Sequence, residues 1–212
     1  TALDGTNYPN TLALDFGRIE PGASKAAAWL FTSTLQGFFR DYSATFQHED
    51  TLGNIHLSTI KSISIHEMSH IVEAGYGFAD GKADYLVNLQ EQDNLPDTLY
   101  LSDGSTNPVR TVLQCSFDGV PSQSNPQVQL TAPMPAGWVY LRVPDPSLGQ
   151  LTLTSVRRSD GEQIKVGLNA WTTDRFFPGP GVRPVRTNQL HLLDYNSTGS
   201  YTLEYVTAAG QD

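Results

Sequence analysis

Residues 138–143 read WVYLRV, residues 150–156 read QLTLTSV and residues 201–206 read YTLEYV. In each run, side chains that suit a core alternate with side chains that suit water, and this two-residue period is that of a β-strand. Asp-Gly dipeptides, which form tight hairpin turns at low cost, occur at residues 4–5, 80–81, 103–104, 118–119 and 160–161. Short strands separated by such turns predict an all-β fold of the sandwich type.

The first half of the chain has the same character. Short apolar or aromatic stretches that favour strands lie at residues 12–16, 29–32 and 38–46. Between the two strand-rich halves, residues 91–97 read EQDNLPD, a polar stretch with a proline that is typical of a domain boundary. We therefore expect two β domains in tandem, residues 1–94 and residues 95–212, with one continuous β domain as the alternative.

Composition and charge argue against several classes of partner. Of the 212 residues, 39% are hydrophobic and 17% are charged, which suits a folded chain. The formal net charge is −9, so the phosphates of a nucleic acid and an anionic membrane surface would be repelled. No apolar run approaches the roughly 20 residues of a membrane span. Few lysines, an acidic balance and abundant Ser, Thr, Gly and Asn are typical of a secreted or cell-surface bacterial protein.

Residues 66–70 read HEMSH, a match to the H-E-x-x-H pattern of zinc metallopeptidases. On a helix, His66 and His70 would share one face and bind one Zn²⁺, while Glu67 would act as general base on the metal-bound water. A third ligand is also needed, and Glu91, 21 residues after His70, is the candidate. A zinc peptidase that uses these residues is therefore one functional hypothesis.

The backbone around the motif favours a strand instead. Residues 60–65 read IKSISI, and alternating β-branched residues of this kind favour strands. If the strand continues, His66 and His70 lie about 13 Å apart at about 3.3 Å per residue, too far to share a metal ion. We therefore predict a strand through residues 60–72, with no catalysis and no cofactor, and keep the zinc site as the alternative.

A wider pattern runs from residue 14 to residue 104. It consists of Asp15-Phe16-Gly17, Ile19, Pro21-Gly22, Trp29, residues 35–38 (LQGF), residues 42–46 (YSATF), His48, Leu52-Gly53, residues 65–67 (IHE) and residues 95–104 (LPDTLYLSDG). This pattern resembles immunoglobulin-like modules of large secreted or cell-surface bacterial proteins. The resemblance implies two immunoglobulin-like β-sandwich domains in a non-catalytic spacer, adhesion or carbohydrate-binding role, and it implies no catalytic residue.

Residues 171–181 read WTTDRFFPGPG, an aromatic stretch that runs into proline and glycine. A loop of this composition presents aromatic and cationic side chains to a sugar or a protein partner. The predicted binding residues are Trp171, Arg175, Phe176 and Phe177. The alternative is a long loop folded over the core with its aromatic side chains buried.

Three further features have simpler interpretations. The Asp-Gly turns offer oxygen ligands to Ca²⁺, but no turn has the spacing of an EF-hand loop, so calcium stays an alternative. Arg157 and Arg158 with Asp160 and Glu162 are predicted to form an exposed hairpin tip, where ion pairs contribute about 0–1 kcal/mol. Cys115 is the only cysteine, which excludes an internal disulfide, and it is predicted to pack as a small apolar residue.

The sequence thus predicts a non-catalytic β-sandwich segment of a larger secreted or cell-surface protein. Its expected partners are the other domains of the parent chain and a glycan or surface protein, with no nucleic acid and no membrane span. The backbone state of residues 60–72 discriminates between the two hypotheses, because a strand supports this one and a helix supports the peptidase.

Overall fold

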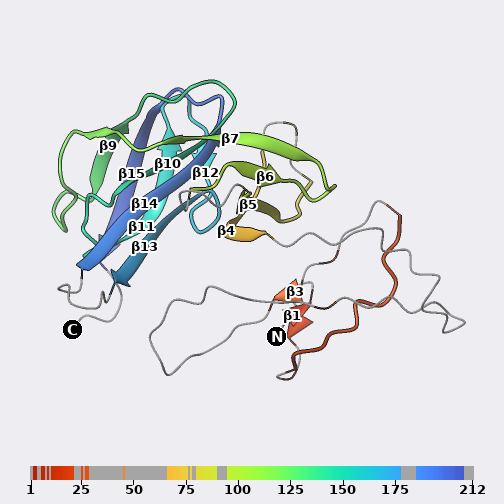
Figure 1. Cartoon of the computed structure of the whole chain (residues 1–212). Helices are drawn as coiled ribbons and strands as arrows, with labels where there is room; N and C mark the ends of the chain where they lie inside the picture. Colours follow the sequence, from red (N-terminus) through yellow and green to blue (C-terminus); the bar gives the residue numbers. More distant parts are fainter. Residues whose placement is uncertain are drawn as a thin grey trace, which may run out of the picture. The chain divides into compact units, whose positions relative to one another are not determined.

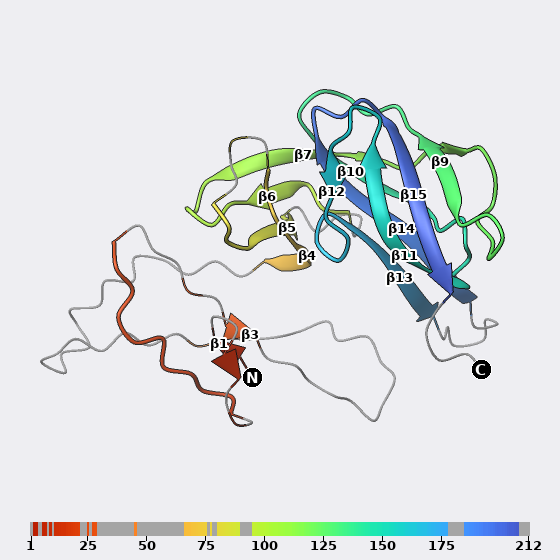
Figure 2. The same cartoon turned by 180° about the vertical axis from the view of Figure 1, so that it is seen from behind.

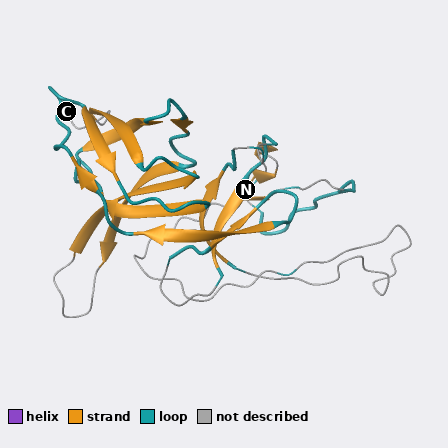
Figure 3. Ribbon diagram, turned by 90° about the horizontal axis from the view of Figure 1, so that it is seen from above, coloured by secondary structure: helices purple, strands orange, loops and turns teal. Residues whose placement is uncertain are grey.

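The computed structural model describes residues 66–75, 77, 80–89, 95–177 and 185–207, together with short stretches before residue 66. Those stretches are residues 2–3, 6–7, 9, 11–21, 25, 27–28 and 45. The fifteen regular elements of the described part are all strands, and Figure 3 shows strands and loops there and no helix. The described residues accordingly include no helix that is long and apolar enough to cross a membrane.

The contacts between residues divide the chain into two compact units, residues 1–65 and residues 66–212. In the first unit, the described strands form a small antiparallel sheet in the order β2-β1-β3. These strands are β1 (Ala2–Leu3), β2 (Thr6–Asn7) and β3 (Ala27–Ala28). The second unit contains the other described strands and two larger sheets.

The first of these two sheets has seven strands, and all neighbours are antiparallel except β10 and β7, which are parallel. In spatial order they are β13 (Ala170–Phe177), β14 (Val185–Tyr195), β10 (Trp138–Pro144), β7 (Thr106–Val112), β6 (Thr98–Tyr100), β5 (Asp84–Asn88) and β4 (Glu67–Val72). Residues 106–108 of β7 pair with β6, and residues 109–112 pair with β10. Strand β7 therefore joins β4, β5 and β6 to the rest of the sheet (Figure 1).

The second sheet has five antiparallel strands. In spatial order they are β12 (Gln163–Ile164), β11 (Leu151–Arg158), β15 (Ser200–Thr207), β9 (Gln127–Thr131) and β8 (Ser116–Phe117). The last strand, β15, lies in the middle of this sheet and not at its edge (Figure 2).

The main core lies between the two sheets. Strand β15 sends Tyr201, Leu203 and Tyr205 inward, and they pack with Leu141 of β10 and Leu192 of β14. Each of these side chains is at most 1% exposed. Burial of an apolar side chain of this size contributes roughly 1.5–3 kcal/mol, so this layer holds the two sheets together as a sandwich.

A second core lies on the opposite face of the seven-stranded sheet, where Trp138 and Tyr140 of β10 pack with Leu86, Leu99 and Leu193. These side chains alternate along β10 and β14 with those of the main core, because successive side chains of a strand point to opposite faces. The sheet therefore has a buried layer on each face of its β10 and β14 strands.

The two edge strands of the curled seven-stranded sheet meet through side chains. The His70 ring on β4 stacks on the Trp171 ring on β13 with centroids 3.8 Å apart. The side-chain amide of Asn169, just before β13, accepts a hydrogen bond from the Glu73 backbone N–H at 3.0 Å and donates one to the Glu73 carbonyl at 2.9 Å. Residues about a hundred positions apart thereby close the second core.

The strands predicted around WVYLRV, QLTLTSV and YTLEYV are confirmed as β10, β11 and β15, and the all-β prediction is confirmed with them. The two facing sheets are consistent with a β-sandwich. Positive φ angles at Gly104 (85°) and Gly161 (97°) place two of the predicted Asp-Gly turns between β6 and β7 and between β11 and β12.

The strands predicted in the first half of the chain, and the predicted domain boundary, have other outcomes. Residues 12–16 are described and form no strand; Leu12 is 80% exposed, and no described strand pairs with this stretch to satisfy its backbone. Residues 29–32 and all of residues 38–46 except Thr45 lie outside the described residues. The observed division at residues 65 and 66 differs from the predicted boundary at 94 and 95, because β5 pairs with β6 across that point.

Candidate functional site

The outer face of the five-stranded sheet carries a regular array of polar side chains, which we call the polar grid. The register pairs Arg157 with Thr202 and Thr202 with Gln129, and it pairs Ser155 with Glu204 and Glu204 with Gln127. Paired residues share a face of a sheet, so the grid has two rows across β11, β15 and β9. Its six members are Arg157, Thr202, Gln129, Ser155, Glu204 and Gln127.

A β-bulge in β11 builds the grid on that strand. The pairing with β15 shifts between Leu153 and Ser155, which inserts one extra residue and reverses the side-chain alternation beyond it. As a result, Val156 turns into the core with 0% exposure, while Ser155 and Arg157 face outward. Without the bulge, the alternation that buries Leu153 would bury Arg157 as well.

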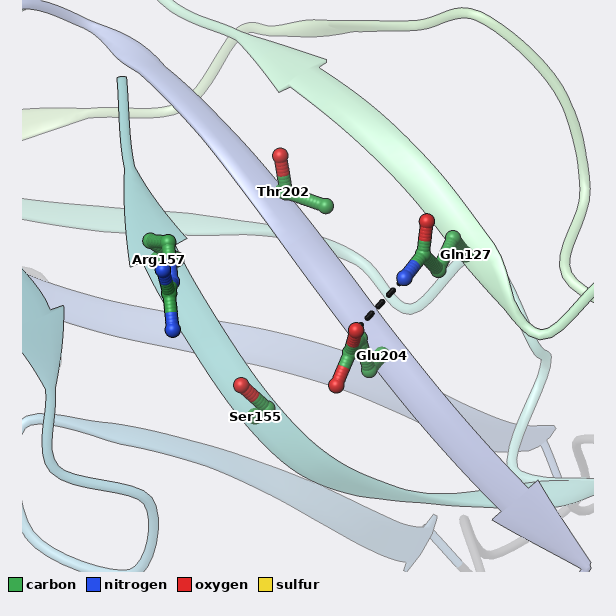
Figure 4. Close-up of a pocket in the computed structure, with 5 residues that line it drawn as sticks. All are labelled: Gln127, Ser155, Arg157, Thr202 and Glu204. Atoms are coloured by element: carbon green, nitrogen blue, oxygen red, sulfur yellow. Dashed lines mark hydrogen bonds between the residues drawn. The ribbon is translucent and has the colours of Figure 1, made fainter. Parts of the chain in front are cut away.

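Five of the grid residues line a hollow of about 260 Å³ in this face, namely Gln127, Ser155, Arg157, Thr202 and Glu204. Figure 4 shows these side chains on the three neighbouring strands. The Gln127 Nε2 donates a hydrogen bond to Glu204 Oε1 at 2.5 Å, and the Thr202 hydroxyl donates one to Gln129 Oε1 at 3.0 Å. These bonds fix the amide and carboxylate groups of the hollow relative to one another.

Two charged groups of the hollow keep unused hydrogen-bonding capacity. Within the described part of the chain, the Arg157 guanidinium forms no ion pair and no side-chain hydrogen bond. Only the Oε1 of the Glu204 carboxylate is bonded to a described side chain, that of Gln127. The hollow therefore offers a planar set of N–H donors and a carboxylate acceptor to a ligand.

The HEMSH residues have a different geometry from that of a zinc peptidase. Residues Glu67–Val72 form strand β4, with a bulge between Met68 and His70, so the prediction of a strand is confirmed for residues 67–72. Residues 60–65 lie outside the described residues, as does Glu91, the candidate third ligand. The helix on which the zinc mechanism depends is therefore contradicted at the motif itself.

The two histidine rings are engaged with different partners. His66 Nε2 lies 3.3 Å from the Tyr100 hydroxyl, and the two rings stack at 5.4 Å. His70 Nε2 lies 3.1 Å from the Gly167 carbonyl, where it donates a hydrogen bond in the matching tautomer, and its ring covers Trp171. Both imidazoles thus serve contacts between strands. Among the residues described, no group of three or more His, Cys, Asp or Glu side chains is placed to share a metal ion, calcium included.

Titration of His70 gives a testable consequence of this contact. Burial lowers the pKa of His70 below its ordinary 6.5, against a smaller opposing effect of the Gly167 carbonyl. A lowered pKa in the folded state means that protonation favours unfolding, so this stabilisation is present above pH 6.5 and is lost as the pH falls below it. We expect urea unfolding to show lower stability at about pH 5 than at about pH 7.5, and a smaller difference in His70→Gln. An equal difference in the variant would contradict this assignment.

The predicted loop at residues 171–181 begins as a strand. Residues Ala170–Phe177 form β13, paired with β14 along its whole length. The Trp171 side chain is 9% exposed and belongs to the second core, as the buried alternative predicts. Arg175, Phe176 and Phe177 lie on β13, and their side chains lie outside the described set, as do residues 178–181. The structure does not bring Trp171 to the polar grid, which lies on the other sheet.

Arg158 also departs from its predicted place. Arg157 and Arg158 do precede a hairpin turn, and Arg158 pairs there with Asp160 at 2.8 Å. However, the Arg158 side chain is only 7% exposed, and its Nη1 bonds the fully buried Asp194 carboxylate at 3.0 Å. The prediction of an exposed, weak ion pair is therefore wrong for Arg158, because the bulge in β11 directs it into the molecule.

Cys115 packs against the main core as a partly buried residue. Burial raises the pKa of the Cys115 thiol to about 11, so the thiol stays protonated near neutral pH. A protonated thiol is a poor nucleophile, and the predicted packing role agrees with this position.

Of the polar grid, only Arg157 was singled out from the sequence, as part of a hairpin tip and not as a binding residue. Part of its signal was present in the alternation of QVQLT at residues 127–131 and of YTLEYV, which sends polar side chains to one face. The alignment of β9, β15 and β11 side by side, and the bulge in β11, required the structure.

Comparison with known proteins adds no relative on which these assignments could draw: no family model matches the chain, and no curated protein or solved structure matches it. The function of the chain is therefore inferred from the geometry of the described residues.

Proposed function

We propose that this chain is a non-catalytic β-sandwich module of a larger secreted or cell-surface protein, and that it acts as a carbohydrate-binding segment. Spacing and adhesion are compatible with the same role, because a module that holds a glycan also tethers its parent chain. The other domains of that parent chain and a glycan are its partners.

The observation that carries the proposal is the polar grid with its hollow of about 260 Å³. Four kinds of hydrogen-bonding group, namely amide, hydroxyl, carboxylate and guanidinium, converge there from three strands. Sugar hydroxyls both donate and accept hydrogen bonds, so a mixed set of donors and acceptors suits them. A binding site also gains from rigid supporting elements, and a strand on each side holds the central strand β15.

The geometry at HEMSH argues against a zinc peptidase that uses this motif. Glu67 lies on a strand, and the rings of His66 and His70 contact Tyr100 and Trp171, respectively. Two histidines that bind one Zn²⁺ through H-E-x-x-H must share a helical face. The favoured reading of this stretch is therefore structural: it closes the edge of the second core.

The position of β15 within its sheet bears on the type of sandwich. Immunoglobulin domains place their last strand at the edge of a sheet, whereas β15 lies between β11 and β9. For residues 95–212 this order favours a sandwich in which the chain crosses repeatedly from one sheet to the other, as in jelly rolls. A tandem arrangement of immunoglobulin-like domains stays a prediction for the chain as a whole.

A glycan array probed with the fluorescently labelled whole chain tests the proposal. We expect binding to a subset of glycans, and loss of that binding in Arg157→Ala, because Arg157 is the hollow's main donor. The matched control is Arg110→Ala, an exposed arginine on β7 of the other sheet. Binding to no glycan, or equal binding by both variants, would contradict the proposed site.

A further inference from the structure

We propose that the polar grid binds one neutral sugar ring by two adjacent hydroxyl groups, with Arg157 donating hydrogen bonds and Glu204 accepting them. This inference depends on the proposed carbohydrate-binding function and names the class of ligand. It is supported by the size of the hollow, by its donors and acceptors, and by its charge.

The size of the hollow limits the ligand. About 260 Å³ is available, slightly less than the roughly 300–1,000 Å³ of ordinary small-molecule sites. The hollow lies on the open outer face of a sheet, where the short side chains of Ser155 and Thr202 leave room among the longer ones of Gln127, Arg157 and Glu204. It therefore suits one ring of a glycan, with the rest of the glycan extending over the polar face.

The donors and acceptors select a diol. The guanidinium of Arg157 presents several N–H donors in one plane, a geometry that matches two neighbouring oxygen atoms. Glu204 Oε2 accepts no hydrogen bond from a described residue and can accept one from a sugar hydroxyl. Two adjacent hydroxyls of a sugar satisfy both groups, since each hydroxyl can accept from Arg157 and donate to Glu204. The hydroxyls of Ser155 and Thr202 border the same space and can serve either role.

The charge of the site and of the chain excludes an acidic sugar as the preferred ligand. A carboxylate or sulfate in the hollow would gain from Arg157 but would lie close to the Glu204 carboxylate. The chain also carries a net charge of −9, which repels anions over a longer range. A neutral ring uses the same hydrogen-bonding groups without either cost.

The grid is partly organised before a ligand arrives. Gln163 Nε2, on β12, donates hydrogen bonds to the Ser155 hydroxyl at 3.2 Å and to the Val156 carbonyl at 3.0 Å. On the other side, Gln127 and Gln129 hold Glu204 and Thr202. Groups that are already held in place lose less entropy on binding. Of the charged groups in the hollow, only Arg157 has no hydrogen bond to a described side chain that would hold it in place before binding.

An NMR titration of the isotopically labelled whole chain tests this inference. The probes are the methyl glycosides of glucose, mannose and galactose, a deoxy analogue that lacks one of two adjacent hydroxyls, and glucuronic acid as the charged comparison. We expect the neutral glycosides to shift the amide signals of residues 155, 157, 202 and 204. Both the deoxy analogue and glucuronic acid should bind more weakly. Arg157→Ala and Glu204→Gln should each weaken binding by about tenfold, the effect of losing one charged hydrogen-bonding partner.

Matched controls and the contrary outcomes separate the two proposals. Arg110→Ala and Glu162→Gln remove one exposed charge of each sign elsewhere and should leave the titration unchanged. Tighter binding of glucuronic acid, or shifts confined to other residues while the glycan array is positive, would overturn the inference and leave the proposed function standing. No shift with any sugar, together with an empty array, would overturn both.

Discussion

Replacing Asp194 by alanine is expected to lower the free energy of unfolding by about 3–5 kcal/mol, the cost of leaving one partner of a buried ion pair alone. The Asp194 side chain is fully buried and accepts hydrogen bonds from Arg158 Nη1 at 3.0 Å and from the Tyr201 hydroxyl at 2.7 Å. Burial and the Asp194 charge raise the pKa of Tyr201, so its hydroxyl stays protonated and donates a hydrogen bond to Asp194. Alanine at position 194 would leave the Arg158 guanidinium buried and without this carboxylate, although its ion pair with Asp160 would remain.

Urea unfolding followed by tryptophan fluorescence measures this loss, and Arg157→Ala is its control. Arg157 is the neighbour of Arg158 in the sequence but faces the solvent side of the sheet. Its replacement should change stability by no more than about 0.5 kcal/mol, as for most surface positions. A loss below about 1 kcal/mol in Asp194→Ala would place the Arg158 pair among ordinary surface ion pairs and would contradict its burial.

This pair of arginines shows what the sequence of β11 could and could not predict. Both residues were predicted at a hairpin tip, and the tip is there, between β11 and β12. Strict alternation from Leu153 predicts that Arg157 points into the core and Arg158 toward solvent. The bulge has the opposite result: Arg157 points toward solvent and Arg158 into the core. Leu153 and Val156 are both buried although they are three residues apart, whereas regular alternation buries every second residue. This spacing of apolar residues is the sign of the bulge in the sequence. Such a spacing does not fix the position of the bulge, because the partner strand β15 also decides the register.

The edge strand β13 failed as a prediction for a related reason. Its residues, AWTTDRFF, include aromatic and β-branched side chains that suit a strand. The Pro and Gly residues that follow them favour a loop, and the prediction extended that loop over the whole stretch. Strand β14 pairs with β13 from Ala170 opposite Leu192 to Phe177 opposite Val185. That pairing places each residue of β13 opposite a residue of β14 and bonds alternate residues through the backbone. The local sequence carries no record of this partner strand.

For the HEMSH stretch, too, the local structure could be predicted from the sequence, but the role of its histidines could not. Local chemistry permits either a zinc-binding helix or a strand, and the β-branched residues before the motif favoured the strand, which is observed at Glu67–Val72. What the sequence could not give was the role of the histidines. His70 meets Trp171 a hundred positions later, and this contact between the edges of one sheet follows from the curl of the sheet and not from any pattern within the motif.

Trp171→Ala tests that contact, and we expect it to lower the free energy of unfolding by about 3–5 kcal/mol, as for other large-to-small core changes. The indole stacks between His70, at 3.8 Å between ring centroids, and His191, at 4.9 Å and within 4° of parallel. His191 is itself fixed by the Tyr140 hydroxyl at Nδ1 and the Thr173 hydroxyl at Nε2, both at 2.7 Å. Because these partners hold the His191 ring in place, it is not free to collapse into the space that the indole leaves.

The same variant separates a core role for Trp171 from the sugar-binding role predicted from the sequence. Trp171→Phe keeps an aromatic ring in the stack and should lose clearly less stability than Trp171→Ala, since aromatic pairing contributes about 0.5–1.5 kcal/mol beyond burial. In the fraction of Trp171→Ala that remains folded, the sugar titration should match that of the unmodified chain, because Trp171 lies on the other sheet from the polar grid. Unchanged stability together with lost sugar binding in Trp171→Ala would contradict the assignment of Trp171 to the second core. It would instead make Trp171 a contact of the ligand.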